Sequence, residues 1–300
     1  MILSADVLET PLCRLLGIEV PIVQAPMTAR IELALAVADA GGLGLVKIGR
    51  AEPEGIPDAM NHVAGRRIGV NYILGRDCDE HLEIALEAGV KIVSFFWGEP
   101  GRRVDRVHEA GGVVLLTVGC AEEARRAEAA GVDVVVAQGV EAGGHVWGSV
   151  STVVLVPAVV DAVEIPVIAA GGIADGRGLA AALMLGAQAA WLGTRFVASA
   201  EGPHLYKDRI VDAVETETAY STIFGDGWAD APHRTLVNDA VREGRTRSVA
   251  PPQSADELET AALYAGQSSA LIHDVAPAGD LVRRIAAEAR ELLGGSGETR

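Results

Sequence analysis

Three short segments of the sequence carry residues whose types and spacing suit chemistry. Gly171-Gly172 and Gly193-Thr194 are two of them, and His145, directly after two glycines, is the third. Glycine lets backbone N–H groups approach an anion closely, and a threonine hydroxyl adds another donor. Histidine titrates near neutral pH and can remove a proton from a weak carbon acid. The segments therefore predict an anion clamp and a catalytic base.

The elements that must position these segments recur at near-uniform spacing. Short runs of β-branched residues alternate with Ala-, Leu- and Glu-rich stretches, a pattern typical of strands followed by helices. The expected strands are 20–24, 43–47, 67–71, 90–95, 113–117, 132–137, 165–169 and 189–193. The expected helices are 31–40, 77–88, 102–110, 121–130 and 176–185. The stretch 152–163 is a poor helix by propensity, because it holds many valines and Pro157.

Eight strand–helix units indicate a parallel sheet covered by helices. An open doubly wound sheet could use the same units, but a repeat without a break in the middle favours closure. We therefore predict a (β/α)8 TIM barrel over residues 1–200. Residues 201–300 are expected to form a helical extension packed on the barrel, with the last six residues frayed. Its helical signals lie at 206–213, 232–242, 256–265 and 280–293.

Residues at the carboxyl ends of barrel strands carry the function of such folds. The glycine segments follow the seventh and eighth expected strands, the two loops that commonly hold phosphate in barrels. Either segment alone could be only a tight turn. Both together, at the two expected loops, favour phosphate binding.

Further candidates follow other strands on the same face. Met27 could place a soft thioether against a flat ring, and Asn71 and Gln138 offer amides that can read a ring edge. Glu141 either orients the His145 ring or caps the loop. Trp147 is the tryptophan expected to wall the site.

The remaining histidines are expected to be mostly solvated. His62, His81 and His108 lie in or beside expected helices, and His204 lies in the extension. His233 and His273 also lie in the extension, where either could touch the barrel mouth.

Composition bounds the function classes. The chain has 300 residues, 49% hydrophobic and 22% charged, enough to bury a large core without disulfides. A net charge of −16 argues against nucleic-acid binding and requires backbone N–H groups, not a basic surface, to hold any anion. The three cysteines show no metal or redox spacing, so no metal site is expected. We find no signal-peptide pattern and no membrane-length apolar run, so a cytoplasmic protein without membrane partners is expected.

Four segments resemble the nitronate monooxygenase family, formerly called 2-nitropropane dioxygenase. They are Gln24-Ala25-Pro26-Met27, Gln138–His145, Pro166–Gly176 and Leu192–Phe196. Within them, Glu-Ala-Gly-Gly-His and Ala-Ala-Gly-Gly-Ile-Ala-Asp-Gly are the most specific. The resemblance extends into the extension through Tyr206-Lys207, Ala231-Pro232-His233-Arg234 and Ala265-Gly266-Gln267-Ser268.

The resemblance implies FMN bound noncovalently at the barrel mouth. Its phosphate would lie at Gly172, Gly193 and Thr194, beside Gly171, and its ring would contact Ala25, Met27, Asn71 and Gln138. His145 would remove the proton next to a nitro group, with dioxygen as the second substrate and a carbonyl compound and nitrite as products. A homodimer is one arrangement that the sequence allows.

The same motifs occur in FMN- and NADH-dependent enoyl-acyl-carrier-protein reductases of type II. Those enzymes commonly have glutamate where this chain has Gln138, which favours the monooxygenase. Thr28-Ala29-Arg30 and Val146-Trp147-Gly148 depart from both families and alter the pocket. Three hypotheses remain open: a nitronate monooxygenase, an NAD(P)H-dependent FMN reductase of enoyl thioesters or quinones, and a flavin-binding protein without turnover.

Overall fold

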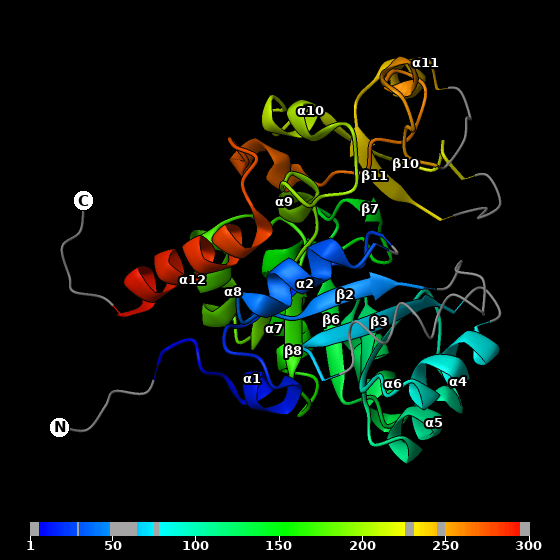
Figure 1. Ribbon diagram of the computed structural model, residues 1–300, viewed down its shortest axis with the longest axis vertical. Helices are drawn as coiled ribbons and strands as arrows, with labels where there is room; N and C mark the ends of the chain where they lie inside the picture. Colours follow the sequence, from blue (N-terminus) through cyan, green and yellow to red (C-terminus); the bar gives the residue numbers. More distant parts are fainter. Residues whose placement is uncertain are drawn as a thin grey trace.

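A parallel eight-stranded sheet forms the centre of the molecule (Figure 1). The computed structural model describes residues 6–28, 30–48, 65–74, 78–225, 231–244 and 250–294. The order of the strands is β1-β9-β8-β6-β5-β4-β3-β2. Their bounds are β1 Ile22–Gln24, β2 Gly44–Lys47, β3 Ile68–Ile73, β4 Ile92–Phe96, β5 Val113–Val118, β6 Val134–Gln138, β8 Val167–Ala170 and β9 Ala189–Leu192. Each of the eight expected strands is confirmed.

The two ends of this strand order meet, so the sheet closes almost completely. The Leu43 N–H donates to the Ile22 carbonyl, and the Gln24 N–H donates to the Leu43 carbonyl, both at 2.9 Å. The buried Gln24 side chain adds a further link, because its Oε1 accepts from the Leu45 N–H at 3.1 Å. The predicted (β/α)8 barrel is confirmed.

Helices cover the outside of the barrel and one helix covers its bottom. The outer helices include α2 Glu32–Asp39, α4 Asp79–Glu87, α5 Arg103–Glu109, α6 Ala121–Ala129, α7 Thr152–Val160 and α8 Gly176–Met184. Helix α1, Pro11–Leu16, buries Leu12 and Leu16 against apolar residues that point into the barrel from its strands. Because the bottom is filled, a ligand can enter only at the opposite end, where the carboxyl ends of the strands lie.

The low helix propensity of 152–163 does not prevent helix α7. Leu155, Val156 and Val159 of α7 are buried against the sheet, so the apolar face supplies what propensity does not. Pro157 lies inside the helix and lacks the N–H that would bond to Val153, a residue exposed to solvent. The free carbonyl at Val153 can therefore bond to water.

The last hundred residues combine helices with strands. Helix α9 spans Thr194–Val197, α10 Lys207–Val211, α11 Asp239–Glu243 and α12 Ala278–Gly294. The expected helix 232–242 is wrong in its first half, because His233–Leu236 is strand β11, paired with β10 (Thr218–Ser221) on one side and β7 (Gly144–His145) on the other. The expected helix 256–265 is reduced to the 3-10 turn Ala255–Glu257.

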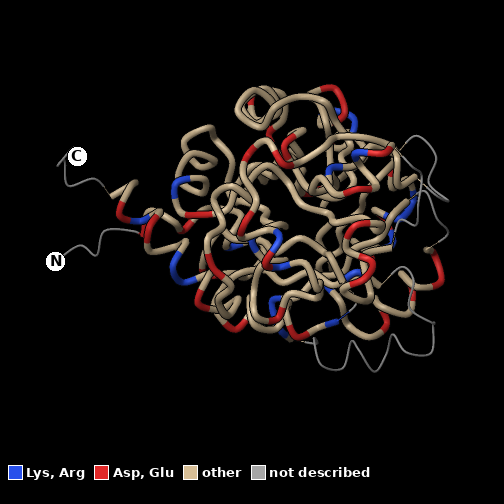
Figure 2. The backbone as a smooth tube through the Cα atoms, turned by 90° about the horizontal axis from the view of Figure 1, so that it is seen from above, with Lys and Arg blue, Asp and Glu red and all other residues tan. Residues whose placement is uncertain are grey.

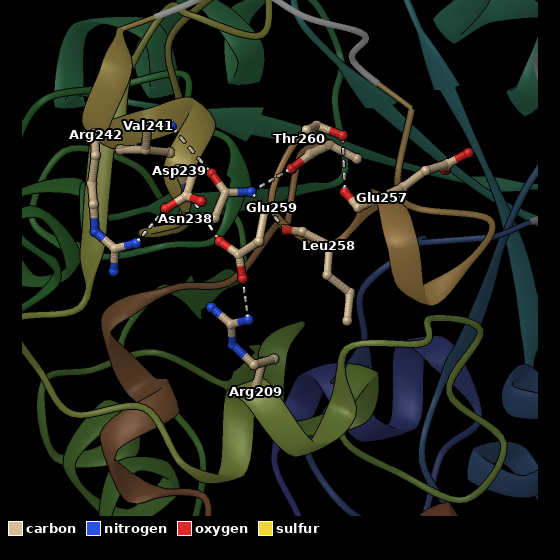
Figure 3. A network of polar contacts seen from close by, with 10 residues as sticks. Arg209, Asn238, Asp239, Val241, Arg242, Glu257, Leu258, Glu259 and Thr260 are labelled. Atoms are coloured by element: carbon tan, nitrogen blue, oxygen red, sulfur yellow. Dashed lines mark hydrogen bonds and ion pairs between the residues drawn. The ribbon is translucent and has the colours of Figure 1, made fainter.

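A polar network holds the segment around β11 in place (Figure 3). The buried Asn238 side chain accepts from the Val241 N–H, which caps α11, and donates to the Leu258 and Ala261 carbonyls at 2.9 Å each. Glu259 then pairs with Arg209 of α10 at 2.7 Å. These contacts connect three separate stretches of the extension.

Helix α12 belongs to the ring of helices around the barrel. It packs against α8 and α2 (Figure 1). The Glu288 carboxylate accepts from the N–H of Gly176 at 2.9 Å. The division into a barrel, 1–200, and an extension, 201–300, stays a prediction. Figure 2 shows Asp and Glu spread over the described part of the chain. In the part of the chain that the structure describes, no helix has the length and apolar character to cross a membrane.

Candidate active site

A cavity of about 330 Å³ lies at the carboxyl ends of the barrel strands. It collects seven of the predicted site residues: Ala25, Met27, Asn71, Gln138, His145, Gly193 and Thr194. The other described residues that line it are Pro26, Lys47, Ile73, Phe96, Thr117, Gly143, Gly144, Trp191, Val197, His204, Ala250, Pro251 and Tyr264. Residues far apart in the sequence therefore meet at the end of the barrel where the carboxyl ends of the strands lie.

Gly171 and Gly172 lie in the turn after β8 and are not among the residues that line this cavity. Both have positive φ, at 100° and 74°, which glycine adopts readily. A Cβ on Gly171 would lie 3.0 Å from the Gly139 carbonyl and from Thr152 Oγ1, whereas a Cβ on Gly172 would meet only Glu141 Cβ at 3.7 Å. Packing thus explains Gly171, while Gly172 leaves open space that an anion could use.

Thr194 presents a hydroxyl whose hydrogen is left for a ligand. Its Oγ1 accepts from the Gly266 N–H at 2.9 Å, so the hydroxyl hydrogen must point elsewhere. The residue is buried and lines the cavity at the start of α9. At the neighbouring Gly193 a Cβ would meet only Ala25 Cβ, at 3.6 Å, so the backbone is approachable there. This donor set, with no carboxylate among the described lining residues, suits a phosphate.

The two candidate amides are already partly engaged. Asn71 directs Nδ2 to the Ser94 carbonyl and hydroxyl, both at 3.2 Å, which leaves its Oδ1 as the atom for a ligand donor. Gln138 donates to the His145 carbonyl at 3.2 Å and accepts from the Trp147 N–H at 2.9 Å. Gln138 therefore holds the backbone on both sides of Val146.

His145 is held by strand pairing as well as by Gln138. It lies on β7 directly opposite His233 of β11. Gly143, before it, approaches the backbone so closely that a Cβ would lie 2.5 Å from the Ala265 carbonyl carbon. Gly144 has φ 76°, and a Cβ on it would meet nothing within 4 Å. The first glycine is required by contact and the second by conformation.

Aromatic rings surround the His145 imidazole. The ring centroids of Tyr264, His233 and Trp97 lie 5.6, 5.8 and 6.1 Å from it. Trp97, which follows β4, has a positive φ of 71°, a strained conformation for a bulky residue. The expectation that Trp147 is the tryptophan near the site is thus incomplete, because Trp97 contacts His145 and Trp191 lines the cavity.

Other histidines differ from their expected solvated state. His233 is fully buried; its Nδ1 donates to the Ala231 carbonyl and its Nε2 accepts from the Phe224 N–H, which fixes the neutral form. Burial lowers the pKa of His233. His204 lines the cavity and stacks on Tyr206, and burial followed by the nearby Lys207 lowers its pKa to about 4. His273 is exposed, and His62 lies outside the described residues.

Glu141 caps a helix. Its carboxylate accepts from the Thr152 N–H at 3.0 Å and from the Thr152 hydroxyl at 2.9 Å, at the first turn of α7. Of the two roles open from the sequence, the structure supports the cap. Among the described residues, no three His, Cys, Asp or Glu side chains are grouped to hold a metal ion.

Sequence reasoning missed several lining residues, notably Lys47, His204 and Tyr264. Lys47 carries the same signal that identified Asn71, since each stands at the carboxyl end of an expected strand. His204 and Tyr264 had no local signal, because they reach the cavity through the folding of the extension.

A closed barrel whose cavity at the strand ends combines an apolar lining with a few polar side chains defines a (β/α)8-barrel enzyme. The model of the nitronate monooxygenase family matches residues 57–288. The chain therefore belongs to the nitronate monooxygenase family, and it is an oxidoreductase that uses a flavin.

Relatives and solved structures agree with this assignment. The nitronate monooxygenase of Pseudomonas aeruginosa is 34% identical, over 92% of this chain and 98% of that protein. A (3aS,4S,5R,7aS)-5-hydroxy-7a-methyl-1-oxo-octahydro-1H-indene-4-carboxyl-CoA dehydrogenase of Mycobacterium tuberculosis is 39% identical, over 79% of this chain and 68% of that protein. Among structures, FabK from Thermotoga maritima has a TM-score of 0.86 at 36% identity, covering 95% of this chain and 97% of that chain. Nitroalkane oxidase from Streptomyces ansochromogenes has a TM-score of 0.84 at 33% identity, covering 94% and 99%.

Proposed function

We propose that this protein is an FMN-dependent nitronate monooxygenase that oxidises alkyl nitronates and nitroalkanes with dioxygen to a carbonyl compound and nitrite. The observation that carries the proposal is that one cavity contains both the donors at Gly193-Thr194 and the imidazole of His145. The first suits a phosphate, and the second suits removal of a proton from a carbon acid. An enzyme of this kind needs its phosphate-binding donors and its base in one cavity, so that the bound cofactor and the substrate can meet there.

The residues present fit FMN. Gly172, Gly193 and Thr194 would hold its phosphate, with Gly171 shaping the turn. Ala25, Met27, Asn71 and Gln138 would contact its ring, and Asn71 Oδ1 would accept from a ring N–H. When bound, FMN supplies the capacity to take electrons from the substrate and pass them to dioxygen.

His145 would act as the base when the substrate is a neutral nitroalkane. It would take the proton from the carbon beside the nitro group, and the electron pair of the broken C–H bond would move into the nitronate. His233 stays neutral behind it, so the His233 ring adds no positive charge beside the imidazolium that forms. The rings of Trp97 and Tyr264 pack beside the His145 imidazole.

His145→Asn tests this role, because asparagine keeps polarity and similar volume without a basic nitrogen. We expect turnover of 1-nitropropane to fall by about 100-fold or more, the usual size of a general-base contribution, while FMN stays bound. Turnover of the preformed propyl-1-nitronate, which needs no deprotonation, should change far less. Equal turnover of 1-nitropropane by variant and wild type would refute the base assignment.

A reductase or dehydrogenase of acyl thioesters is the second candidate. It is favoured by the 39% identical relative named a CoA dehydrogenase and by the structural likeness to FabK. Gln138 argues against it. The type II reductases that this chain resembles commonly have glutamate at this position, and an ionised glutamate could not donate to the His145 carbonyl as Gln138 does.

Anaerobic mixing separates the two candidates. Rapid bleaching of the flavin absorbance by NADH or NADPH would support the reductase, while bleaching by a nitronate alone would support the monooxygenase. No bleaching with any donor would leave the third hypothesis, a flavin-binding protein without turnover. A cytoplasmic location and a homodimer remain predictions.

A further inference from the structure

The described lining of the cavity contrasts with the acidic composition of the whole chain. The chain has a net charge of −16, yet no Asp or Glu is found among the described residues lining the cavity. Lys47 is the one described lining residue with a permanent charge; His145, His204 and Tyr264 are the other titratable ones. An ammonium group in a lining whose described residues include no carboxylate can attract an anionic ligand.

The fold fixes the location of Lys47. It is the last residue of β2, pairs in register with Asn71 of β3, and its N–H donates to the Thr28 carbonyl at 2.9 Å. The loop that carries Pro26 and Met27 into the cavity is thus tied to Lys47. Its half-buried side chain lines the same cavity.

The strand order places Lys47 across the barrel from His145. Around the closed sheet, β2 is four strands away from β6 in either direction, so the two strands face each other. Gln138 ends β6 and holds the backbone of His145. A substrate between the two walls would therefore meet an ammonium group on one side and an imidazole on the other.

We propose that Lys47 is the specificity-determining residue that binds the negatively charged oxygens of the substrate, while His145 handles the proton at the opposite wall. This inference rests on the proposed function for the identity of the substrate. When the C–H bond of a nitroalkane breaks, the proton goes to His145 and the electron pair forms the C=N bond of the nitronate. The negative charge then lies on the two oxygens, where an ammonium group stabilises it.

Nitrate is the probe, because it is a planar, unreactive anion that presents the same oxygens as a nitronate. The matched variants of the FMN-loaded protein are Lys47→Met, which keeps length without charge, and Lys47→Arg, which keeps charge. The dissociation constant of nitrate is measured by calorimetry at two salt concentrations. We expect Lys47→Met to weaken nitrate binding by about tenfold or more, the factor typical of a hydrogen bond to a charged group, and Lys47→Arg to stay within about threefold of wild type.

Turnover provides the second measurement. The kcat/KM for propyl-1-nitronate should fall by about tenfold or more in Lys47→Met and recover largely in Lys47→Arg. Thermal unfolding and bound-flavin absorbance of both variants show that they are folded and loaded. A nitrate dissociation constant unchanged in Lys47→Met would overturn the proposal. So would a shifted flavin midpoint potential with unchanged nitrate binding, because the charge would then act on the cofactor.

The two proposals can fail separately. Lys47-dependent nitrate binding by a protein that does not oxidise nitronates supports the anion site and refutes the monooxygenase. Nitronate oxidation that is equal in wild type and Lys47→Met supports the monooxygenase and refutes the role of Lys47.

Discussion

Adjacent glycines before His145 should respond differently to the same substitution. A methyl group on Gly143 would lie 2.5 Å from the Ala265 carbonyl carbon and 2.8 Å from its Cα, which are backbone atoms that cannot rotate away. A methyl group on Gly144 would meet nothing within 4 Å and would cost only the positive φ of 76°. We therefore expect Gly144→Ala to lower the free energy of unfolding by about 1–2 kcal/mol and Gly143→Ala by about 3 kcal/mol.

The functional effects should separate as well. Gly266, beside Ala265, donates its N–H to Thr194 Oγ1, and the Gln267 N–H bonds to the Glu141 carbonyl at 3.0 Å. Pushing this segment away from Gly143 would break the contact that orients the Thr194 hydroxyl. Gly143→Ala should therefore lose FMN more readily, whereas Gly144→Ala should keep FMN and lose turnover through displacement of His145.

Urea unfolding followed by circular dichroism measures the stability difference, and fluorescence of released flavin measures cofactor retention. The two substitutions control for each other, because they add the same methyl group to neighbouring residues. If Gly144→Ala were as destabilising as Gly143→Ala, or if both kept FMN equally, the close contact with Ala265–Gly266 would not be what requires glycine.

Two further substitutions test the contacts around the site. Gln138→Leu removes the hydrogen bonds to the His145 carbonyl and the Trp147 N–H, and it should lower kcat about tenfold to 100-fold with little change in KM. Gln138→Glu keeps the acceptor for the Trp147 N–H, so its kcat should be intermediate. Equal kcat in wild type and both variants would contradict a positioning role. Hydrogen bonds from Arg284, and then from Arg195, lower the pKa of Asp274 to about 2. The Asp274 carboxylate therefore contributes fully to stability above about pH 3.9, the pKa of aspartate in the unfolded chain, and this contribution is lost as pH falls through 2. Asp274→Asn should destabilise the protein at pH 7 by about 2 kcal/mol, because it leaves the buried Arg195 without its carboxylate partner. It should also flatten the decline of the unfolding temperature between about pH 4 and 2. An unchanged decline of the unfolding temperature in this pH range would argue against the role of the Arg195–Asp274 pair.

The barrel was predictable because its signals are local. Most strands of the sheet are short runs rich in β-branched residues, and within the described residues most are followed by a helix; the glycine segments stand at fixed places in that repeat. Residues 233–236 were misassigned because His-Arg-Thr-Leu has no strong strand preference of its own. It becomes a strand only where β7 and β10, both distant in sequence, supply partners on either side.

The site was predictable to the extent that its residues end barrel strands. Gln138 and Lys47 end their strands, Asn71 lies two residues before the end of β3, and Thr194 lies two residues after the end of β9. His204 and Tyr264 could not be assigned, because their place depends on how the extension folds back over the cavity. The engagement of Gln138 with the His145 backbone likewise depends on a turn geometry that residue types do not reveal.

Helix α12 is synthesised after every strand of the barrel that it covers, and this order affects how the nascent chain folds. Within the described part of the chain, helix α12 (Ala278–Gly294) packs on both α2 and α8 and covers the seam between them. While these residues are still within the ribosome, the nascent barrel must expose the apolar surface that Leu281, Val282 and Ile285 later bury. Early termination of translation before this helix would therefore leave an incomplete product that exposes apolar surface and is prone to aggregate.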